Sequence, residues 1–185
     1  MTKYLSTRPV GYVAFVLFIL TIFMSNWALM NLGWNCSQNG PCVIPVWPGV
    51  WAPSGVLFAG VALVLRDVIQ NLLGKRWTLF AIFVGAVLSG ANSPASLVLG
   101  STLAFLFSEL ADFAVYTPLR KKSLALAILA SGLVGSFVDS VIFLQMAFGS
   151  LDYILGQVIG KFWMSVLGAA ILLGGHRVLT PRTMA

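Results

Sequence analysis

The sequence predicts an all-α polytopic membrane protein, a six-transmembrane-helix bundle with its N and C termini in the cytoplasm. Hydrophobic residues make up 59% of the 185 residues and charged residues only 9%, and the mean hydropathy is +0.95. Soluble domains carry about 25% charged residues, so this composition is typical of a chain that lies in lipid. Six apolar runs and the placement of basic residues between them support the same class, and we expect residues 1–185 to form one domain.

The six runs are each close to the ~20 residues that a transmembrane helix needs. They cover residues 9–32, 51–73, 77–89 (extending toward 92), 95–116, 124–148 and 153–173. The first run is longer than the ~7 to 15 residues of a signal-peptide core, and no small-residue cleavage pattern follows it. We therefore expect it to be a retained first helix.

The third and fourth runs are separated by only a few residues, and a single merged span is the alternative. Merging them would move the basic cluster Arg120, Lys121 and Lys122 to the outside, against the positive-inside rule. Two spans joined by a tight outer turn are therefore preferred.

Basic residues alternate between the two sides of this predicted bundle. The N-terminus, the second and fourth connections and the C-terminal tail hold Lys or Arg, whereas the first, third and fifth connections hold none. The residues concerned are Lys3, Arg8, Lys75, Arg76, Arg120, Lys121, Lys122, Arg177 and Arg182. This alternation predicts cytoplasmic termini in a bacterial-type inner membrane, and it explains the net charge of +6 without a nucleic-acid partner.

The first outer connection, residues 33–50, is expected to be a structured loop, and it contains Cys36 and Cys42. The compartment outside such a membrane is oxidising, so a disulfide between them is plausible, with two free thiols as the alternative. The single histidine, His176, lies near the cytoplasmic end of the last span. We therefore expect no metal site.

The sequence contains no set of residues for catalysis, no phosphate-binding glycine loop and no ATP-binding motif. We expect neither an enzyme nor a cofactor. Any transport would be driven by a gradient, by trapping of the substrate or by a separate protein.

Besides Arg66, five charged side chains lie within the predicted spans: Asp67, Glu109, Asp112, Asp139 and Lys161. A charge at the centre of a membrane helix costs about 2.5 to 3.5 kcal/mol on insertion scales, so such residues usually line a polar cavity or pathway. The chain is therefore interpreted as a membrane transporter.

Depth in the membrane predicts which of these charges meet. At 1.5 Å per residue, Asp139 and Lys161 both lie ~4 Å outward from the middle of their spans, and we expect an ion pair between them. The pair is either purely structural or part of the site.

Arg66 is a further intramembrane cation, ~6 to 8 Å inward of the middle of its span, at the level of Glu109 and Asp112. We expect it to reach an acid on the fourth span, and Asp112 is the expected partner. Two cations against four acids leave an excess of negative charge, so a carboxylate must be protonated, bind a cation or accept hydrogen bonds from a polar substrate.

Aromatic residues share helical faces with these acids. Phe105, Glu109, Asp112 and Tyr116 follow one face of the fourth span, and Asp139 and Phe143 share a face of the fifth. Rings beside a carboxylate suit a flat, nitrogen-rich ligand.

A small-residue motif, Gly156-x-x-x-Gly160, lies in the last span. It indicates close helix packing, either within the bundle or between the subunits of a homodimer.

Together these residues resemble the vitamin uptake transporter (VUT) family, the queuosine precursor transporters, over nearly the whole chain. The motifs that carry the resemblance are Ser25-Asn26, Arg66-Asp67-Val68-Ile69-Gln70-Asn71, Ser108-Glu109-Leu110-Ala111-Asp112, Ser136-Phe137-Val138-Asp139-Ser140, and Gln157 with Lys161. Gln70 stands where the family commonly has an acid, and Glu109 where Gln is frequent.

The resemblance implies a six-helix importer of 7-deazaguanine bases such as 7-cyano-7-deazaguanine (preQ0), preQ1 or queuine. The expected substrate-binding residues are Asn26, Asp67, Gln70, Phe105, Glu109, Asp112, Tyr116, Asp139, Phe143, Gln157 and Lys161. Two alternatives stay open: the substrate-binding subunit of an energy-coupling-factor vitamin transporter, and a membrane scaffold without a substrate.

Overall fold

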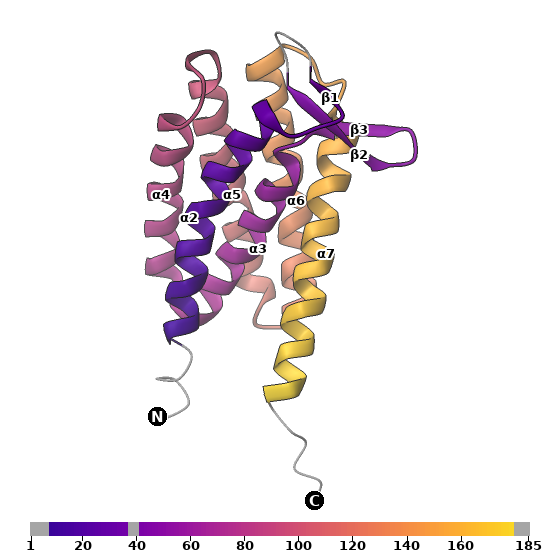
Figure 1. Cartoon of the computed structure of the whole chain (residues 1–185). Coiled ribbons are helices and arrows are strands. Elements are labelled where there is room, and N and C mark those ends of the chain that lie inside the picture. Colours follow the sequence, from indigo (N-terminus) through magenta and orange to yellow (C-terminus); the bar gives the residue numbers. More distant parts are fainter. Residues whose placement is uncertain (1–7, 37–40, 180–185) are drawn as a thin grey trace, which may run out of the picture.

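The computed structural model of the chain describes residues 8–36 and 41–179, which form a bundle of six α-helices with a small sheet at one end (Figure 1). The helices are α2 (Arg8–Asn31), α3 (Val56–Leu72), α4 (Lys75–Ala91), α5 (Val98–Leu119), α6 (Leu124–Phe148) and α7 (Ile154–Leu179). A 3-10 turn, η1 (Ala95–Leu97), precedes α5. The predicted six-helix bundle is confirmed, and because α4 and α5 are separate helices, the merged span is wrong.

The side chains are arranged as expected for a protein in lipid. Large apolar side chains face outward, with Phe83 of α4 67% exposed and Leu155 of α7 59% exposed. The interior instead holds charged groups, since Arg66 and Asp112 are fully buried. Charged residues are almost never fully buried in soluble domains unless they are paired, so these buried groups require partners inside the bundle.

Three helices, α2, α5 and α6, are long and apolar enough to cross a membrane by length and composition. α3 and α4 have 17 residues each, which is the lower limit of the ~17 to 25 residues found in membrane spans. In α7, which has 26 residues, Ile154–Gly168 is an apolar segment. The chain is thus a helical membrane protein.

The connection between α2 and α3 differs from the loop expected on the outer side, because it forms a three-stranded antiparallel sheet. Its strands are β1 (Asn35–Cys36), β2 (Cys42–Trp47) and β3 (Val50–Pro53), in that order. Gly49, with a φ of 75°, makes the tight turn between β2 and β3, a conformation that only glycine adopts without cost. β3 takes residues 51–53 from the predicted second span, so that span was placed too early. Pro53 explains the shift, because a proline holds the residue before it in an extended conformation.

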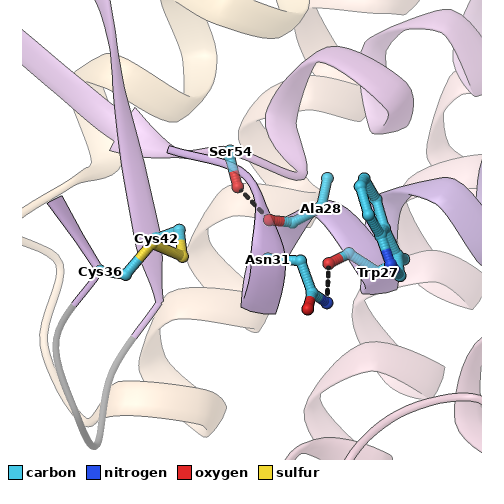
Figure 2. The surroundings of a disulfide bond; sticks show 6 residues. All are labelled: Trp27, Ala28, Asn31, Cys36, Cys42 and Ser54. Atoms are coloured by element: carbon cyan, nitrogen blue, oxygen red, sulfur yellow. Dashed lines mark hydrogen bonds between the residues drawn. A yellow bond between two sulfur atoms is a disulfide. The ribbon is translucent and has the colours of Figure 1, made fainter. Parts of the chain in front are cut away.

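A disulfide joins Cys36 to Cys42 across the first two strands, with the two Cα atoms 4.0 Å apart (Figure 2). Just beyond the sheet, the hydroxyl of Ser54 donates a hydrogen bond of 2.6 Å to the carbonyl oxygen of Ala28 near the end of α2. The end of α2 beside the sheet is thus linked to the start of α3.

The sheet rests on the first turns of α7. A Cβ atom on Gly156 would collide with the carbonyl oxygen of Trp51 in β3, and one on Gly160 would lie 3.0 Å from Val56 of α3. The Gly156-x-x-x-Gly160 motif therefore packs inside the chain, and it gives no support to a homodimer.

The basic residues of the connections gather at the end opposite the sheet (Figure 1). Arg8 begins α2, Lys75 and Arg76 begin α4, and Arg120 to Lys122 lie between α5 and α6. Lys3 and Arg182 lie outside the described residues. All the connections that carry basic residues in the described ranges therefore lie at one end of the bundle.

Candidate functional site

A cavity lies inside the half of the bundle that carries the sheet. It has a volume of about 70 Å³, and side chains from all six helices and from Pro53 of β3 line it. Its polar lining residues are Thr21, Ser25, Asn26, Ser89, Ser101, Ser108, Glu109, Asp139, Gln157 and Lys161. A polar chamber thus lies within an apolar bundle.

One wall of the cavity carries an ion pair between Lys161 of α7 and Asp139 of α6. The ammonium group of Lys161 also lies 3.0 Å from the hydroxyl oxygen of Ser140, which in turn donates a 2.6 Å hydrogen bond to the carbonyl oxygen of Ser136. Lys161 is 1% exposed, whereas Asp139 is 19% exposed. Asp139 therefore keeps part of its carboxylate free toward the cavity.

Glu109 of α5 lies at the base of the cavity, where a second cation meets it. The Nε–H group of Arg66 donates to Oε2 of Glu109 over 3.2 Å. Glu109 lines the cavity but Arg66 does not. Glu109 is thus shared between the cavity and the polar network behind it.

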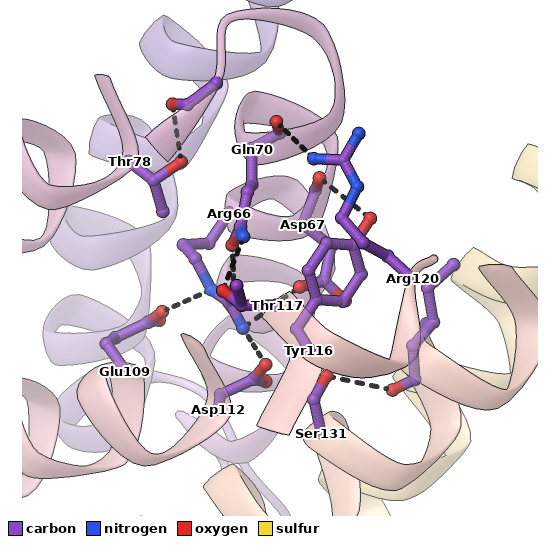
Figure 3. A network of polar contacts seen from close by, with 12 residues as sticks. Arg66, Asp67, Gln70, Thr78, Glu109, Asp112, Tyr116, Thr117, Arg120 and Ser131 are labelled. Carbon is purple, nitrogen blue, oxygen red and sulfur yellow. Dashed lines mark hydrogen bonds and ion pairs between the residues drawn. The ribbon is translucent and has the colours of Figure 1, made fainter. Parts of the chain in front are cut away.

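That network is centred on the guanidinium group of Arg66 (Figure 3). It pairs with Asp67 over 3.0 Å and with Asp112, and it donates to Gln70 over 3.1 Å. The side-chain amide of Gln70 in turn donates a 2.9 Å hydrogen bond to the hydroxyl oxygen of Thr117. Arg66, Asp67 and Gln70 come from α3, whereas Asp112 and Thr117 come from α5, so the network holds these two helices together.

The network continues toward the basic end through Arg120. Its guanidinium group donates to the carbonyl oxygen of Gln70 over 2.9 Å and to Oδ1 of Asn71 over 2.8 Å. The ring of Tyr116 lies near both cations, with the Cζ atoms of Arg66 and Arg120 at 5.5 and 5.9 Å from its centre. From Glu109 to Arg120 the network extends ~16 Å along α5 at 1.5 Å per residue.

Two aromatic rings and an amide complete the cavity. Phe105 packs against Gly85 of α4, where a Cβ atom would lie 2.5 Å from its ring, and Phe143 packs edge-on against Phe148. Asn26 donates a 3.2 Å hydrogen bond to the carbonyl oxygen of Ser89. Phe105 and Phe143 come from α5 and α6 and belong to the cavity lining.

The structure divides the expected binding residues into two groups. Seven line the cavity: Asn26, Phe105, Glu109, Asp139, Phe143, Gln157 and Lys161. The other four, Asp67, Gln70, Asp112 and Tyr116, lie in the network around Arg66 and are not part of the lining. Asp112 shares a helical face with Glu109, but it lies one turn further from the cavity and meets Arg66 instead.

Small hydroxyl residues of the lining were missed in the sequence. Thr21, Ser89 and Ser101 line the cavity, yet a serine or threonine in an apolar span gives a weak signal because it can bond to its own helix. Thr21 does so, donating to the carbonyl oxygen of Phe18 over 2.7 Å. Only the packing of the helices shows which of these hydroxyl groups line the cavity.

The cavity is chemically suited to a flat polar molecule. Carboxylates from α5 and α6 can accept hydrogen bonds, amides from α2 and α7 can donate or accept, and aromatic rings supply apolar walls. In residues 8–36 and 41–179 there is no group of three or more His, Cys, Asp or Glu side chains that could hold a metal ion.

Residues 91–174 match a family model described as "Putative vitamin uptake transporter". The match covers a little under half of the chain, including α5, α6 and most of α7. It supports a membrane transporter and includes Glu109, Asp112, Asp139 and Lys161. No curated protein and no solved structure matches the chain.

Proposed function

We propose that this chain is a transporter that imports a queuosine precursor, a 7-deazaguanine base such as preQ0, preQ1 or queuine, across the cytoplasmic membrane. The observation that carries the proposal is the pair of carboxylates, Glu109 and Asp139, that line one cavity inside an apolar bundle. The similarity of residues 91–174 to vitamin uptake transporters supports the same class.

A guanine-like base offers groups that complement this lining. Its edge carries neighbouring N–H donors, which a carboxylate with two acceptor oxygens can bind together. Glu109 or Asp139 would bind this edge, while Gln157 and Asn26 can donate to the ring nitrogens and the carbonyl oxygen. Phe105 and Phe143 would contact the faces of the ring, because aromatic side chains pack well against flat π systems.

The charge distribution supports the proposed direction of transport. Basic connections favour the cytoplasmic side, which puts the sheet and the cavity in the outer half of the membrane. A base from outside would thus enter the cavity first and meet the Arg66 network before reaching the cytoplasm.

The second candidate is the substrate-binding subunit of an energy-coupling-factor vitamin transporter. Its size and six-helix plan are similar, and the absence of an ATP-binding motif from the sequence fits both a solo transporter and such a subunit. Purification in mild detergent distinguishes them, because a solo transporter is expected to copurify without an ATPase, whereas the subunit would retain one.

Direct binding of preQ0 to the purified protein tests the proposed function. Glu109→Gln replaces an acceptor-only group by an amide at a buried site, a change that costs ~1 to 3 kcal/mol. We expect preQ0 affinity measured by calorimetry to fall about 5- to 150-fold. Asp152→Asn, an exposed acid outside the helices, is the matched control and should bind like the wild type.

Two results would contradict the proposal. Absence of preQ0, preQ1 and queuine binding to well-folded wild-type protein would remove this substrate class. Unchanged affinity in folded Glu109→Gln would remove Glu109 from the site.

A further inference from the structure

Three carboxylates surround a single cation in the network behind the cavity. Asp67 and Glu109 lie 3.0 and 3.2 Å from the guanidinium nitrogens of Arg66, and Asp112 pairs with the same group. All four side chains are at most 2% exposed. If every carboxylate were ionised, this buried cluster would carry two uncompensated negative charges.

No other cation of the described chain forms an ion pair with the cluster. Lys161 is paired with Asp139, and Arg120 donates to Gln70 and Asn71. On the neighbouring helices α2 and α4, the titratable side chains of the described residues are Arg8, Tyr12, Lys75 and Arg76, all in the first two turns.

α6, which closes the cluster beside Asp112, presents no charge there. A Cβ atom on Gly135 would lie 3.2 Å from Oδ2 of Asp112, and the next residue is Ser136. Among the described side chains, Oδ2 of Asp112 and the hydroxyl of Ser136 are both buried without a hydrogen-bond partner. A carboxylate oxygen that accepts no hydrogen bond keeps its lone pairs free to take up a proton.

The geometry fits a proton better than a metal cation. The guanidinium group already occupies the space on which the carboxylates converge, and the described residues include no group of three or more His, Cys, Asp or Glu that could hold a metal ion. A proton needs no such space, because it binds to a single oxygen atom.

We infer that the Arg66 cluster, with Asp112 Oδ2 as the acceptor atom, binds the proton that drives import. One proton enters from the outer side with each base and is released to the cytoplasm, and no covalent bond to the substrate forms or breaks. The inference rests on the proposed function, since it assigns the energy source of that same transport.

Glu109 connects the cavity with the Arg66 cluster. Its carboxylate lines the cavity and accepts a hydrogen bond from Nε of Arg66. A base that bonds to Glu109 therefore weakens the hydrogen bond between Glu109 and Arg66. Arg66 is then shared mainly by Asp67 and Asp112, which changes the proton affinity of the cluster. By linkage, protonation changes base affinity by the same factor.

Infrared spectroscopy tests the proton site without any substrate. Wild-type protein in lipid nanodiscs at neutral pH is expected to show the C=O stretching band of a protonated carboxyl group. Asp112→Asn should lose it, and the exposed-site control Asp152→Asn should keep it. Absence of the band in the wild type, or its persistence unchanged in Asp112→Asn, would overturn the assignment.

Uptake of radiolabelled preQ0 into liposomes containing the wild-type protein tests the coupling. With the membrane potential clamped at zero, an outside pH one unit lower should give about tenfold accumulation for one proton per base, because one pH unit is worth a factor of ten. Asp112→Asn should reduce the accumulation ratio to near one, and Asp152→Asn should not.

The outcomes separate the two proposals. Entry of preQ0 without accumulation in a pH gradient, or accumulation driven by a sodium gradient instead, would overturn the inference while leaving the proposed function intact. Failure of preQ0 to enter under any gradient would overturn the proposed import and with it the driving role of the proton.

Discussion

Lys161 and Asp139 combine two roles, because they pair with each other and both line the cavity. The sequence could predict the pair, since depth along two antiparallel helices depends only on the rise per residue. The same arithmetic predicted that Arg66 reaches the fourth span. It could not distinguish Glu109 from Asp112, because residues three apart on a helix share a face and only the neighbouring helices decide which one meets the cavity.

The two single mutants of the ion pair should differ in stability. Asp139→Asn leaves the buried ammonium group of Lys161 without its partner, and losing one partner of a buried pair costs about 3 to 5 kcal/mol. Lys161→Met should cost less, because Asp139 is 19% exposed and keeps some hydration. Thermal unfolding in detergent measures both.

The double mutant Asp139→Asn/Lys161→Met should recover most of the lost stability but not preQ0 binding, since both side chains line the cavity. Binding with wild-type affinity in the double mutant would mean that the pair is purely structural.

Among the secondary-structure elements, the helices were more predictable than the sheet. Residues 124–148 were predicted to form a span and form α6 with the same bounds, because apolar length alone defines such a helix. The sheet gave no comparable signal. Its strands have two to six residues and contain two prolines, Pro45 and Pro53. They depend on packing against α7 rather than on a regular alternation of polar and apolar residues.

The contact between the sheet and α7 predicts the effect of a single methyl group. Gly156→Ala would place Cβ against the carbonyl oxygen of Trp51, and such overpacking costs about 1 to 3 kcal/mol. Gly100→Ala is the control, because its nearest atom, Cβ of Met146, lies at 3.3 Å. Both changes gain the same helix propensity, so the difference between their melting temperatures measures the contact. Equal melting temperatures would show that the sheet moves aside at no cost.

At the scale of the whole molecule, the two halves of the bundle differ. One half contains the cavity, and in the other half ionic contacts hold the helices together. The cavity lies at the sheet end, and the Arg66 network with Arg120 holds α3 against α5 toward the basic end. Composition and hydropathy predicted the bundle but not this asymmetry, because it depends on which helix faces meet.

The orientation of the bundle can be tested by chemical labelling of intact cells. A cysteine introduced by Ser93→Cys, between α4 and η1, should react with a membrane-impermeant thiol reagent. One introduced by Lys121→Cys, at the basic end, should react only after the membrane is opened. Labelling of Lys121→Cys in intact cells would reverse the orientation and with it the proposed direction of import.

The gathering of basic side chains at one end also has a consequence for the assembled protein in an energised membrane. Six such residues have described side chains there: Arg8, Lys75, Arg76, Arg120, Lys121 and Lys122. Moving one positive charge outward against an inside-negative voltage of 100 mV costs about 2.3 kcal/mol, so inverting the bundle would cost about 14 kcal/mol from these charges alone. Once inserted with this end inside, the bundle is held in place by the cell's own voltage.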